Sequence, residues 1–220
     1  MHWSPLASLD DGEQEAVLGA ARRRSFVKGE IVFHAGDRSD SVHLITSGHF
    51  SVMVSTPDGD LATLNVLGSG DWFGELSMLG EREPAPRSAT IVSLDAAETL
   101  VLTQPAFHRL CESHPRVERL VGGLMAARIR KLSADLLEAR YVDLDQRLCR
   151  ALLDLAEVFG GQDSGLTIPL TQEQLADLVG GTRPSINQAL QQLVREGVVQ
   201  VARGRVTVLD EQALVREAGR

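Results

Sequence analysis

Residues 70–90 of the chain read GDWFGELSMLGEREPAPRSAT, and this stretch holds the most specific pattern in the sequence. Gly74 and Glu75 stand immediately before an expected short helix that begins near Leu76. Glycine lets the backbone approach a ligand closely. The start of a helix presents free N–H groups and a positive dipole end. These features favour the binding of an anion.

A cation and a hydroxyl, Arg87 and Ser88, follow near the end of the same stretch, beyond an irregular loop. The guanidinium of arginine is a planar fork of donors that suits phosphate oxygens. Glu75 can accept hydrogen bonds from the hydroxyls of a ribose. Together these residue types predict a binding site for one phosphate and one sugar, with no catalytic residue.

Short runs of alternating polarity surround this stretch, after a short expected helix over 9–21 and up to residue 103. Glycines and Pro-Asp-Gly turns separate the runs. Many short strands with close turns predict a small β-barrel or jelly roll, which can enclose a single ligand. The expected strands are 31–33, 42–45, 50–54, 62–66, 90–92 and 99–102.

The pattern becomes helical from residue 105 to residue 139. Apolar or small residues recur at a 3-4-3-4-3 spacing, at Gly122, Met125, Ile129, Leu132, Leu136 and Ala139. Charged residues that suit water flank this seam, namely Arg128, Arg130, Lys131, Asp135 and Glu138. Such a seam is typical of a two-chain coiled coil and predicts a symmetric dimer. The alternative is a helix that packs on its own barrel.

Residues 171–208 carry the second strong pattern. Thr171 and Gln174 have the spacing of a capping box, which predicts the start of a short helix. A glycine turn then leads to Thr182, which is placed to cap a second helix. Two helices joined by such a turn predict a helix-turn-helix, and the hairpin expected over 198–208 predicts a wing.

The exposed positions of this segment suit double-stranded DNA. From residue 180 to residue 206 there are four arginines against one acid, whereas the net charge of the 220-residue chain is −8. A local basic face is what a protein that recognises a DNA sequence needs. Contacts with base edges are expected from Arg183, Ser185 and Gln188. Phosphate contacts are expected from Thr171, Gln172, Arg203 and Arg205.

A break at Tyr141–Asp143 separates the long helix from this segment. Asp143 and Gln146 have the spacing of a capping box, so a further helix is expected from Leu144. The sequence thus predicts an α+β protein in four parts. They are a ligand-binding β-barrel domain (1–115), a dimerisation helix (116–140), a hinge (141–143) and a winged helix-turn-helix domain (144–220).

The composition excludes several other classes of protein. Cys111 and Cys149 are the only cysteines, and they form neither a CxxC motif nor a metal-binding Cys/His pattern, so neither disulfides nor a metal are expected. No apolar run approaches the length of a membrane helix, and no basic-then-apolar leader begins the chain. We therefore expect a cytoplasmic protein.

In order and spacing, these motifs resemble those of the cAMP receptor protein/FNR (Crp/Fnr) family of bacterial transcription regulators. The resemblance covers about residues 9–209. FGEL at 73–76 and RSAT at 87–90 match the phosphate-binding cassette of the family, and TQEQLADLVGGTRPSINQAL matches its helix-turn-helix. Each motif alone is moderately specific, and the set is strongly specific.

The resemblance implies a role for each cassette residue. Glu75 would bind the ribose 2′-hydroxyl, and Arg87 and Ser88 would bind the cyclic phosphate. The backbone at Gly74 and Leu76 would assist. The phosphate-and-ribose end of the ligand is therefore well specified by this sequence, and a cyclic nucleotide is the implied effector.

The base end is less well specified. Family members that respond to cAMP tend to carry Thr-Ser or Thr-Asn where this chain has Leu132-Ser133. Leucine can neither donate to adenine nor accept from it, so Ser133 is the remaining polar candidate there. The resemblance also implies that the effector, with cAMP as the first candidate, reorients the DNA-binding domains about the hinge. The implied partners are DNA, a second copy of the chain and RNA polymerase.

Other functions remain open on the sequence alone. The same scaffold could sense a different nucleotide, sense a gas or redox state through haem, or bind DNA without any ligand. The chain has six histidines, any of which could be an axial ligand, at positions 2, 34, 43, 49, 108 and 114. A cupin-type metal enzyme needs a tight His-x-His spacing that is absent here, and it would leave the helix-turn-helix without a role.

Overall fold

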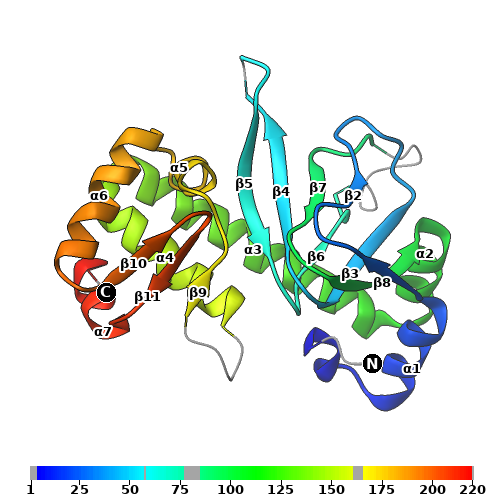
Figure 1. Cartoon of the computed structure of the whole chain (residues 1–220). Helices are drawn as coiled ribbons and strands as arrows, with labels where there is room; N and C mark the ends of the chain where they lie inside the picture. Colours follow the sequence, from blue (N-terminus) through cyan, green and yellow to red (C-terminus); the bar gives the residue numbers. More distant parts are fainter. Residues whose placement is uncertain (1–3, 57, 77–84, 161–165, 220) are drawn as a thin grey trace. The chain divides into compact units, whose positions relative to one another are not determined.

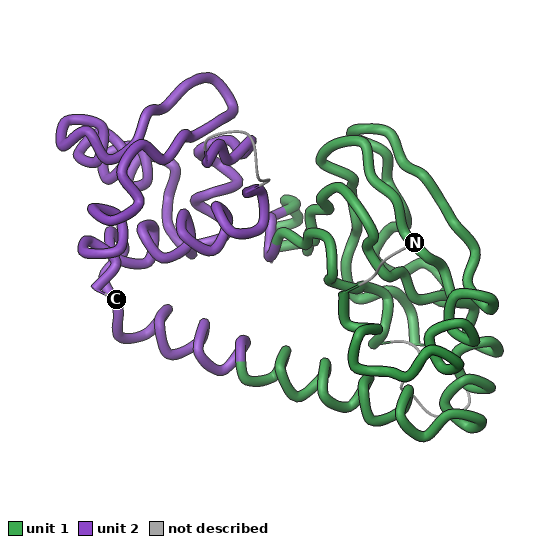
Figure 2. The backbone as a smooth tube through the Cα atoms, turned by 90° about the horizontal axis from the view of Figure 1, so that it is seen from below, with its two compact units in different colours: residues 1–61, 66–130 green, residues 62–65, 131–220 purple. Residues whose placement is uncertain are grey.

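The computed structural model describes residues 4–56, 58–76, 85–160 and 166–219. The chain divides into two compact units, coloured separately in Figure 2. Unit 1 comprises residues 1–61 and 66–130, and unit 2 comprises residues 62–65 and 131–220. The short helix expected after Leu76 falls on residues 77–84, which lie outside the described ranges.

Unit 1 is built on two four-stranded sheets, with strand orders β1-β8-β3-β6 and β2-β7-β4-β5 (Figure 1), although residues 62–65 in the middle of β5 are assigned to unit 2. All six expected strands are present, so the expectation of a mixed fold with an N-terminal β-domain is confirmed. Two strands, β1 and β6, were not expected. Four of the five residues of β1 are exposed and β6 has two residues, so neither gives an alternating pattern. The strands are β1 (Arg22–Phe26), β2 (Ile31–Phe33), β3 (Ser41–Ser47), β4 (Phe50–Ser55), β5 (Leu61–Leu67), β6 (Trp72–Phe73), β7 (Thr90–Ser93) and β8 (Ala97–Thr103).

Strand β3 lies at the centre of unit 1, buried on both of its faces. Successive side chains of a strand point to opposite faces. Val42 and Leu44 therefore join one apolar cluster, which includes residues of the helices, whereas Ile45 joins a second cluster with residues of both sheets. The second cluster holds the two sheets together and forms the wall behind the candidate site.

Helices cover the outer face of the β1-β8-β3-β6 sheet. They are η1 (Ser4–Ser8), α1 (Asp11–Ala20), α2 (Gln104–Ser113) and the first part of α3 (Pro115–Tyr141), and each contributes to the cluster around Leu44. The expected helical region thus consists of two helices. Proline disfavours helical backbone in the residue before it, and His114, which precedes Pro115, is non-helical.

Unit 2 contains the end of α3, two short helices packed against a third, and a small sheet. The sheet order is β10-β11-β9, with β9 (Thr167–Ile168) as a third strand that the sequence pattern did not reveal. The centre of unit 2 is formed by fully buried side chains, which include Leu152, Leu175, Ile186, Leu190 and Leu214. The remaining elements are α4 (Leu144–Phe159), α5 (Gln172–Val179), α6 (Arg183–Arg195), β10 (Val199–Ala202), β11 (Arg205–Val208) and α7 (Glu211–Glu217).

The helix caps follow the sequence with one exception. Thr171 and Gln174 form the expected capping box of α5, and the Thr182 hydroxyl accepts from the N–H of Ser185 at the start of α6. Asp143 is the N-cap residue of α4, but its side chain makes no capping hydrogen bond, so the capping box expected there with Gln146 is wrong. Among the described residues, no helix combines the length and apolar character needed to cross a membrane.

Candidate functional site

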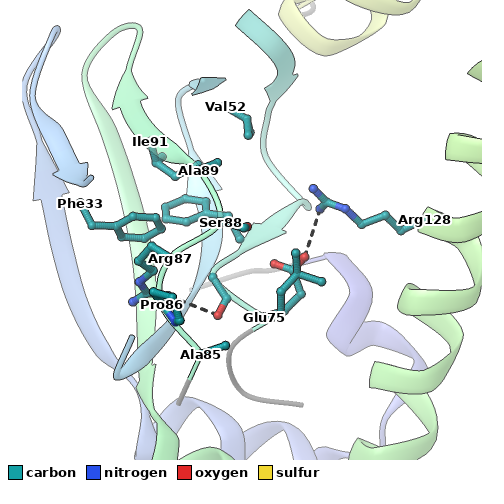
Figure 3. Close-up of a pocket in the computed structure, with 13 residues that line it drawn as sticks. Phe33, Val52, Glu75, Ala85, Pro86, Arg87, Ser88, Ala89, Ile91 and Arg128 are labelled. Carbon is teal, nitrogen blue, oxygen red and sulfur yellow. Dashed lines mark hydrogen bonds and ion pairs between the residues drawn. The ribbon is translucent and has the colours of Figure 1, made fainter. Parts of the chain in front are cut away.

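A cavity of about 140 Å³ opens within unit 1, between the two sheets and α3 (Figure 3). Its inner wall is apolar, formed by Phe33, Val52, Phe73 and Ile91 from four different strands. Its rim is formed by residues 74–76 and 85–89, which are the two ends of the cassette, and by Arg128 of α3. The fold therefore brings Gly74, Glu75, Leu76, Arg87 and Ser88 together around one cavity, as the sequence predicts.

Arg87 is buried, with 5% of its surface exposed, and its guanidinium is held from several sides. Nη1 donates to the backbone oxygen of Ser41 at 2.8 Å and to that of Gly74 at 3.3 Å. Nη2 donates to the Ser41 hydroxyl at 3.1 Å and lies 3.6 Å from a carboxylate oxygen of Asp40. The guanidinium also stacks over the ring of Phe33, with its Cζ 4.0 Å from the ring centroid. These contacts fix the orientation of the fork.

The Nε atom of Arg87 is buried and has no hydrogen-bond partner within the described residues. A buried donor without an acceptor is costly, so such an atom points to an acceptor supplied from elsewhere. Burial lowers the pKa of the Arg87 guanidinium, while the nearby carboxylates of Asp40 and Glu75 oppose that shift. An anion in the cavity would both satisfy the donor and compensate the buried charge.

Gly74 has the backbone conformation that its place in the site requires. Its φ of 85° lies in the region that residues with a side chain rarely adopt. A Cβ at this position would lie 2.6 Å from Nη1 of Arg87 and 2.8 Å from the backbone oxygen of Ser41. Glycine is therefore needed here for the guanidinium to pack against the backbone.

Glu75 lies opposite Arg87 and is almost fully buried, with 3% of its surface exposed. Its Oε1 is 3.6 Å from Nη1 of Arg128 (Figure 3). Arg128, which was expected to suit water beside the helical seam, keeps 31% of its side chain exposed and also pairs with this buried carboxylate. This contact was missed because the two residues are 53 positions apart, and nothing local in the sequence signals it.

The other predicted cassette residues lie at the edge of the cavity. Ser88 and Leu76 line it, with 57% of the surface of Leu76 exposed. Ser133 is an exposed residue of α3 in unit 2 and is not among the described residues that line the cavity. Its expected role toward the base therefore remains a prediction.

His43 lies in the core behind the cavity and is only 2% exposed. Its ring stacks on that of Phe73 at 4.7 Å between centroids, and its Nδ1 is 3.1 Å from the Thr99 hydroxyl. Burial, followed by the positive charges of Arg87 and Arg24, lowers the pKa of His43 to about 3. The residue is thus a neutral part of the core. Within the described ranges, no group of three or more His, Cys, Asp or Glu residues is arranged to hold a metal.

This histidine predicts a loss of stability in mild acid. Between its ordinary pKa near 6.5 and its folded pKa near 3, the unfolded chain binds a proton that the folded chain does not, so stability falls as pH falls. From pH 7 to pH 5 the loss should be about 2 kcal/mol for this group. Urea unfolding at both pH values should show a smaller loss for His43→Leu than for wild type. The exposed-site control His34→Gln should behave as wild type, and equal losses in all three would contradict the assignment.

The helix-turn-helix of unit 2 has the predicted packing. Leu175, Ala176, Val179, Ile186, Leu190 and Leu193 are all buried, and Gly180 has the left-handed conformation that ends α5. Arg183, Gln188, Thr171, Arg203 and Arg205 are exposed, as DNA contacts must be. Ser185 and Gln172 are half-buried: the Ser185 hydroxyl is 2.9 Å from that of Thr182, and Gln172 bonds to Asn187.

Helix α3 divides into a part covered by the β-domain and an uncovered part. Val117 and Val121 are buried against unit 1, and Met125 is partly buried there, so packing on the protein's own β-domain accounts for the first turns. Further along, apolar side chains are more than half exposed, at Ile129 (64%), Leu132 (57%) and Leu136 (54%). The uncovered part coincides with the predicted coiled-coil seam.

Comparison with known proteins agrees with this geometry. Residues 23–114 match the family described as "Cyclic nucleotide-binding domain", and residues 146–217 match the "Crp-like helix-turn-helix domain". The chain is 32% identical over 218 residues to the cyclic AMP receptor protein of Thermus thermophilus, covering 99% of this chain and 97% of that one. It is 28% identical over 219 residues to a CRP-like cAMP-activated global transcriptional regulator of Mycobacterium tuberculosis, covering 96% of each chain.

Solved structures give the same result. A transcriptional regulator of the CRP family from Thermus thermophilus superposes with a TM-score of 0.75 at 28% identity, covering 90% of this chain and 97% of that one. The similarity thus spans both the domain that contains the cavity and the domain that contains the helix-turn-helix. On its sequence, its cassette site and these relatives, the chain belongs to the Crp/Fnr family of DNA-binding transcription regulators.

Proposed function

We propose that this protein is a dimeric regulator whose binding to specific DNA sites is controlled by a cyclic nucleotide, with cAMP as the first candidate. Of two relatives that align over nearly the whole chain, one at 28% identity is named as cAMP-activated and one at 32% identity is named as a cyclic AMP receptor protein. The effector binds in the cavity of unit 1, and DNA binds to the helix-turn-helix of unit 2.

The observation that carries the effector proposal is the buried Arg87, whose Nε lacks an acceptor in the described part of the chain. A cyclic phosphate supplies that acceptor together with the negative charge that the guanidinium needs. Ser88 donates to the same phosphate, and the backbone at Gly74 and Leu76 assists. Glu75, held in place by Arg128, accepts from the ribose 2′-hydroxyl.

The base is recognised less strictly than the phosphate and the sugar. The strand residues that line the cavity are apolar, so they contribute contact area and no hydrogen bonds. Ser133 is the polar side chain that we assign to the base, and Leu132 beside it offers no hydrogen bond. We therefore expect the affinities for different purine cyclic nucleotides to be more similar than in a family member that has Thr-Ser or Thr-Asn at this place.

DNA is bound by α6 in the major groove, with Arg183, Ser185 and Gln188 at base edges. Phosphate contacts come from the start of α5 and from the wing, through Thr171, Gln172, Arg203 and Arg205. The effector acts by favouring one arrangement of the DNA-binding domains about residues 141–143, because a ligand shifts an equilibrium only through differential affinity. The DNA-bound dimer then contacts RNA polymerase.

Effector control has a direct test. Duplexes enriched from a random pool by the protein with cAMP serve as binding sites, and their affinity is measured by fluorescence anisotropy with and without nucleotide. We expect cAMP to tighten binding by roughly 5- to 150-fold, the usual range of allosteric coupling. A larger effect of cGMP would identify a different effector. Equal affinity with and without both nucleotides would contradict control by a cyclic nucleotide while leaving DNA binding intact.

A further inference from the structure

The surface of the helix-turn-helix carries a pair of amide side chains, and one of the two, Asn187, has no role in the contacts proposed above. Nε2 of Gln172, the first residue of α5, donates to Oδ1 of Asn187 in α6 at 3.2 Å. Asn187 is exposed, whereas the core-facing side of α6 is formed by Ile186, Ala189, Leu190 and Leu193. A hydrogen bond between surface side chains adds little stability, so its main effect is to fix the orientation of the Asn187 amide.

Asn187 lies on the same side of α6 as Arg183. Residues four apart on a helix are neighbours on one face, and Asn187 follows Arg183 by four positions. Four residues advance a helix by about 6 Å, which is less than the height of two base-pair steps at 3.4 Å each. An α6 that brings Arg183 to one base pair therefore brings Asn187 close to a neighbouring one.

The remaining hydrogen-bonding capacity of Asn187 matches one base. After it accepts from Gln172, its amide keeps two Nδ2 hydrogens and a second lone pair on Oδ1. In the major groove adenine presents an acceptor at N7 beside a donor at N6, and asparagine can pair with both. Gln172 keeps a second Nε2 hydrogen, which is free to donate to a phosphate oxygen, as proposed above.

We propose that Asn187 is a specificity-determining residue that binds adenine in each half-site, and that Gln172 is the positioning residue that orients it. This inference rests on the proposed insertion of α6 into the major groove. The hydrogen bond between Gln172 and Asn187 links a contact with the DNA phosphate to a contact with the base. Gln172 touches both the phosphate and the Asn187 amide that binds the base.

The test uses the full-length protein with cAMP and a pool of random-sequence duplexes. The sites enriched by wild type should contain one A·T pair per half-site whose preference disappears with Asn187→Ala. Affinity for the wild-type site should fall about 5- to 150-fold, the range of one bidentate base contact. Arg183→Ala should relax a different position, and the exposed control Gln192→Ala should leave the motif unchanged.

A change of preference separates base contact from a structural effect. Asn187→Asp presents acceptors only, so the selected base at this position should change from adenine to cytosine, whose N4 group donates. Gln172→Ala alone should reduce the preference for adenine at the base pair assigned to Asn187. Added to Asn187→Ala, it should have no further effect on base preference there. Thermal melting by circular dichroism establishes that each variant is folded.

Two results would overturn the inference. If Asn187→Ala enriches the same motif as wild type, or weakens all duplexes equally, Asn187 does not bind a base. If wild type itself enriches no sequence, the proposed DNA binding fails along with this inference. The two failures are distinguishable because only the second is seen in the protein without substitutions.

Discussion

Replacing Arg87 by alanine should remove most of the affinity for a cyclic nucleotide. The variant loses a charge-assisted contact with the phosphate and leaves that phosphate unpaired in the cavity, a cost on the order of 2–4 kcal/mol. The dissociation constant for cAMP should therefore rise by roughly 30- to 900-fold. Isothermal titration of cAMP into wild type and the variant measures this directly.

Two further variants sharpen the result. Arg38→Ala removes an exposed arginine from the same unit and should bind cAMP as wild type does. Arg87→Lys keeps the charge but lacks the planar fork, so it cannot maintain the contacts with Ser41 and Phe33 and donate to a phosphate at once. It should bind more weakly than wild type and more tightly than Arg87→Ala.

Arg87 also has structural contacts, so the folding of each variant has to be measured with its binding. Its guanidinium bonds to the backbone oxygens of Ser41 and Gly74, and its loss will lower the melting temperature. A folded Arg87→Ala protein that binds cAMP with the affinity of wild type would show that the phosphate lies elsewhere. If Arg87→Ala binds cAMP weakly at temperatures well below its melting temperature, where it is folded, the result supports the assignment of Arg87 to the phosphate.

Much of this protein could be predicted from short-range patterns. The capping box at Thr171, the buried positions of α5 and α6, and the wing depend on residues a few positions apart, so local sequence is sufficient. The two ends of the cassette could be placed in one site because glycine, carboxylate, arginine and serine are chemically selective for phosphate and ribose.

The contacts that orient these residues could not be predicted. Ser41 and Asp40 hold Arg87 from strand β3 and the residue before it, and Arg128 holds Glu75 from α3. Each of these contacts joins segments more than 40 positions apart, and it exists only because the sheets and α3 pack together. A charged residue on a helix gives no signal of a distant partner, which is why the pairing of Arg128 with Glu75 was missed.

The same reasoning separates the two interpretations of the long helix. Val117 and Val121, which precede the predicted seam of α3, are buried in the protein's own core, whereas Leu132 and Leu136 of the seam are exposed. Sequence spacing cannot distinguish a seam that faces the same chain from one that faces a second copy. The exposure of the later residues supports the dimer for that part of the helix.

Charged substitutions in the exposed seam should therefore dissociate the proposed dimer. A fully buried leucine contributes about 1.5–3 kcal/mol, and a symmetric interface contains each position twice. Leu136→Lys should thus weaken dimerisation by on the order of 3–6 kcal/mol, or at least a hundredfold in dissociation constant. Sedimentation velocity over a dilution series, with and without cAMP, measures the change.

The neighbouring residue gives a matched control. Leu137 is 59% exposed, close to the 54% of Leu136, but it stands outside the 3-4 spacing of the seam. Leu137→Lys should therefore change dimerisation much less than Leu136→Lys. Equal effects of the two substitutions, or a wild-type protein that stays monomeric at micromolar concentration, would contradict the coiled coil.

Dissociation should also abolish tight DNA binding while each domain stays folded. A dimer of helix-turn-helix domains binds two half-sites about one helical turn apart, and a monomer retains only one of them. Because the second half-site is bound at the high effective concentration that the dimer provides, its loss removes far more affinity than any single base contact. Leu136→Lys should therefore lose DNA binding even with cAMP bound, whereas Arg87→Ala should lose only the response to cAMP. That difference between the two variants separates assembly of the DNA-binding surface from its control by the effector.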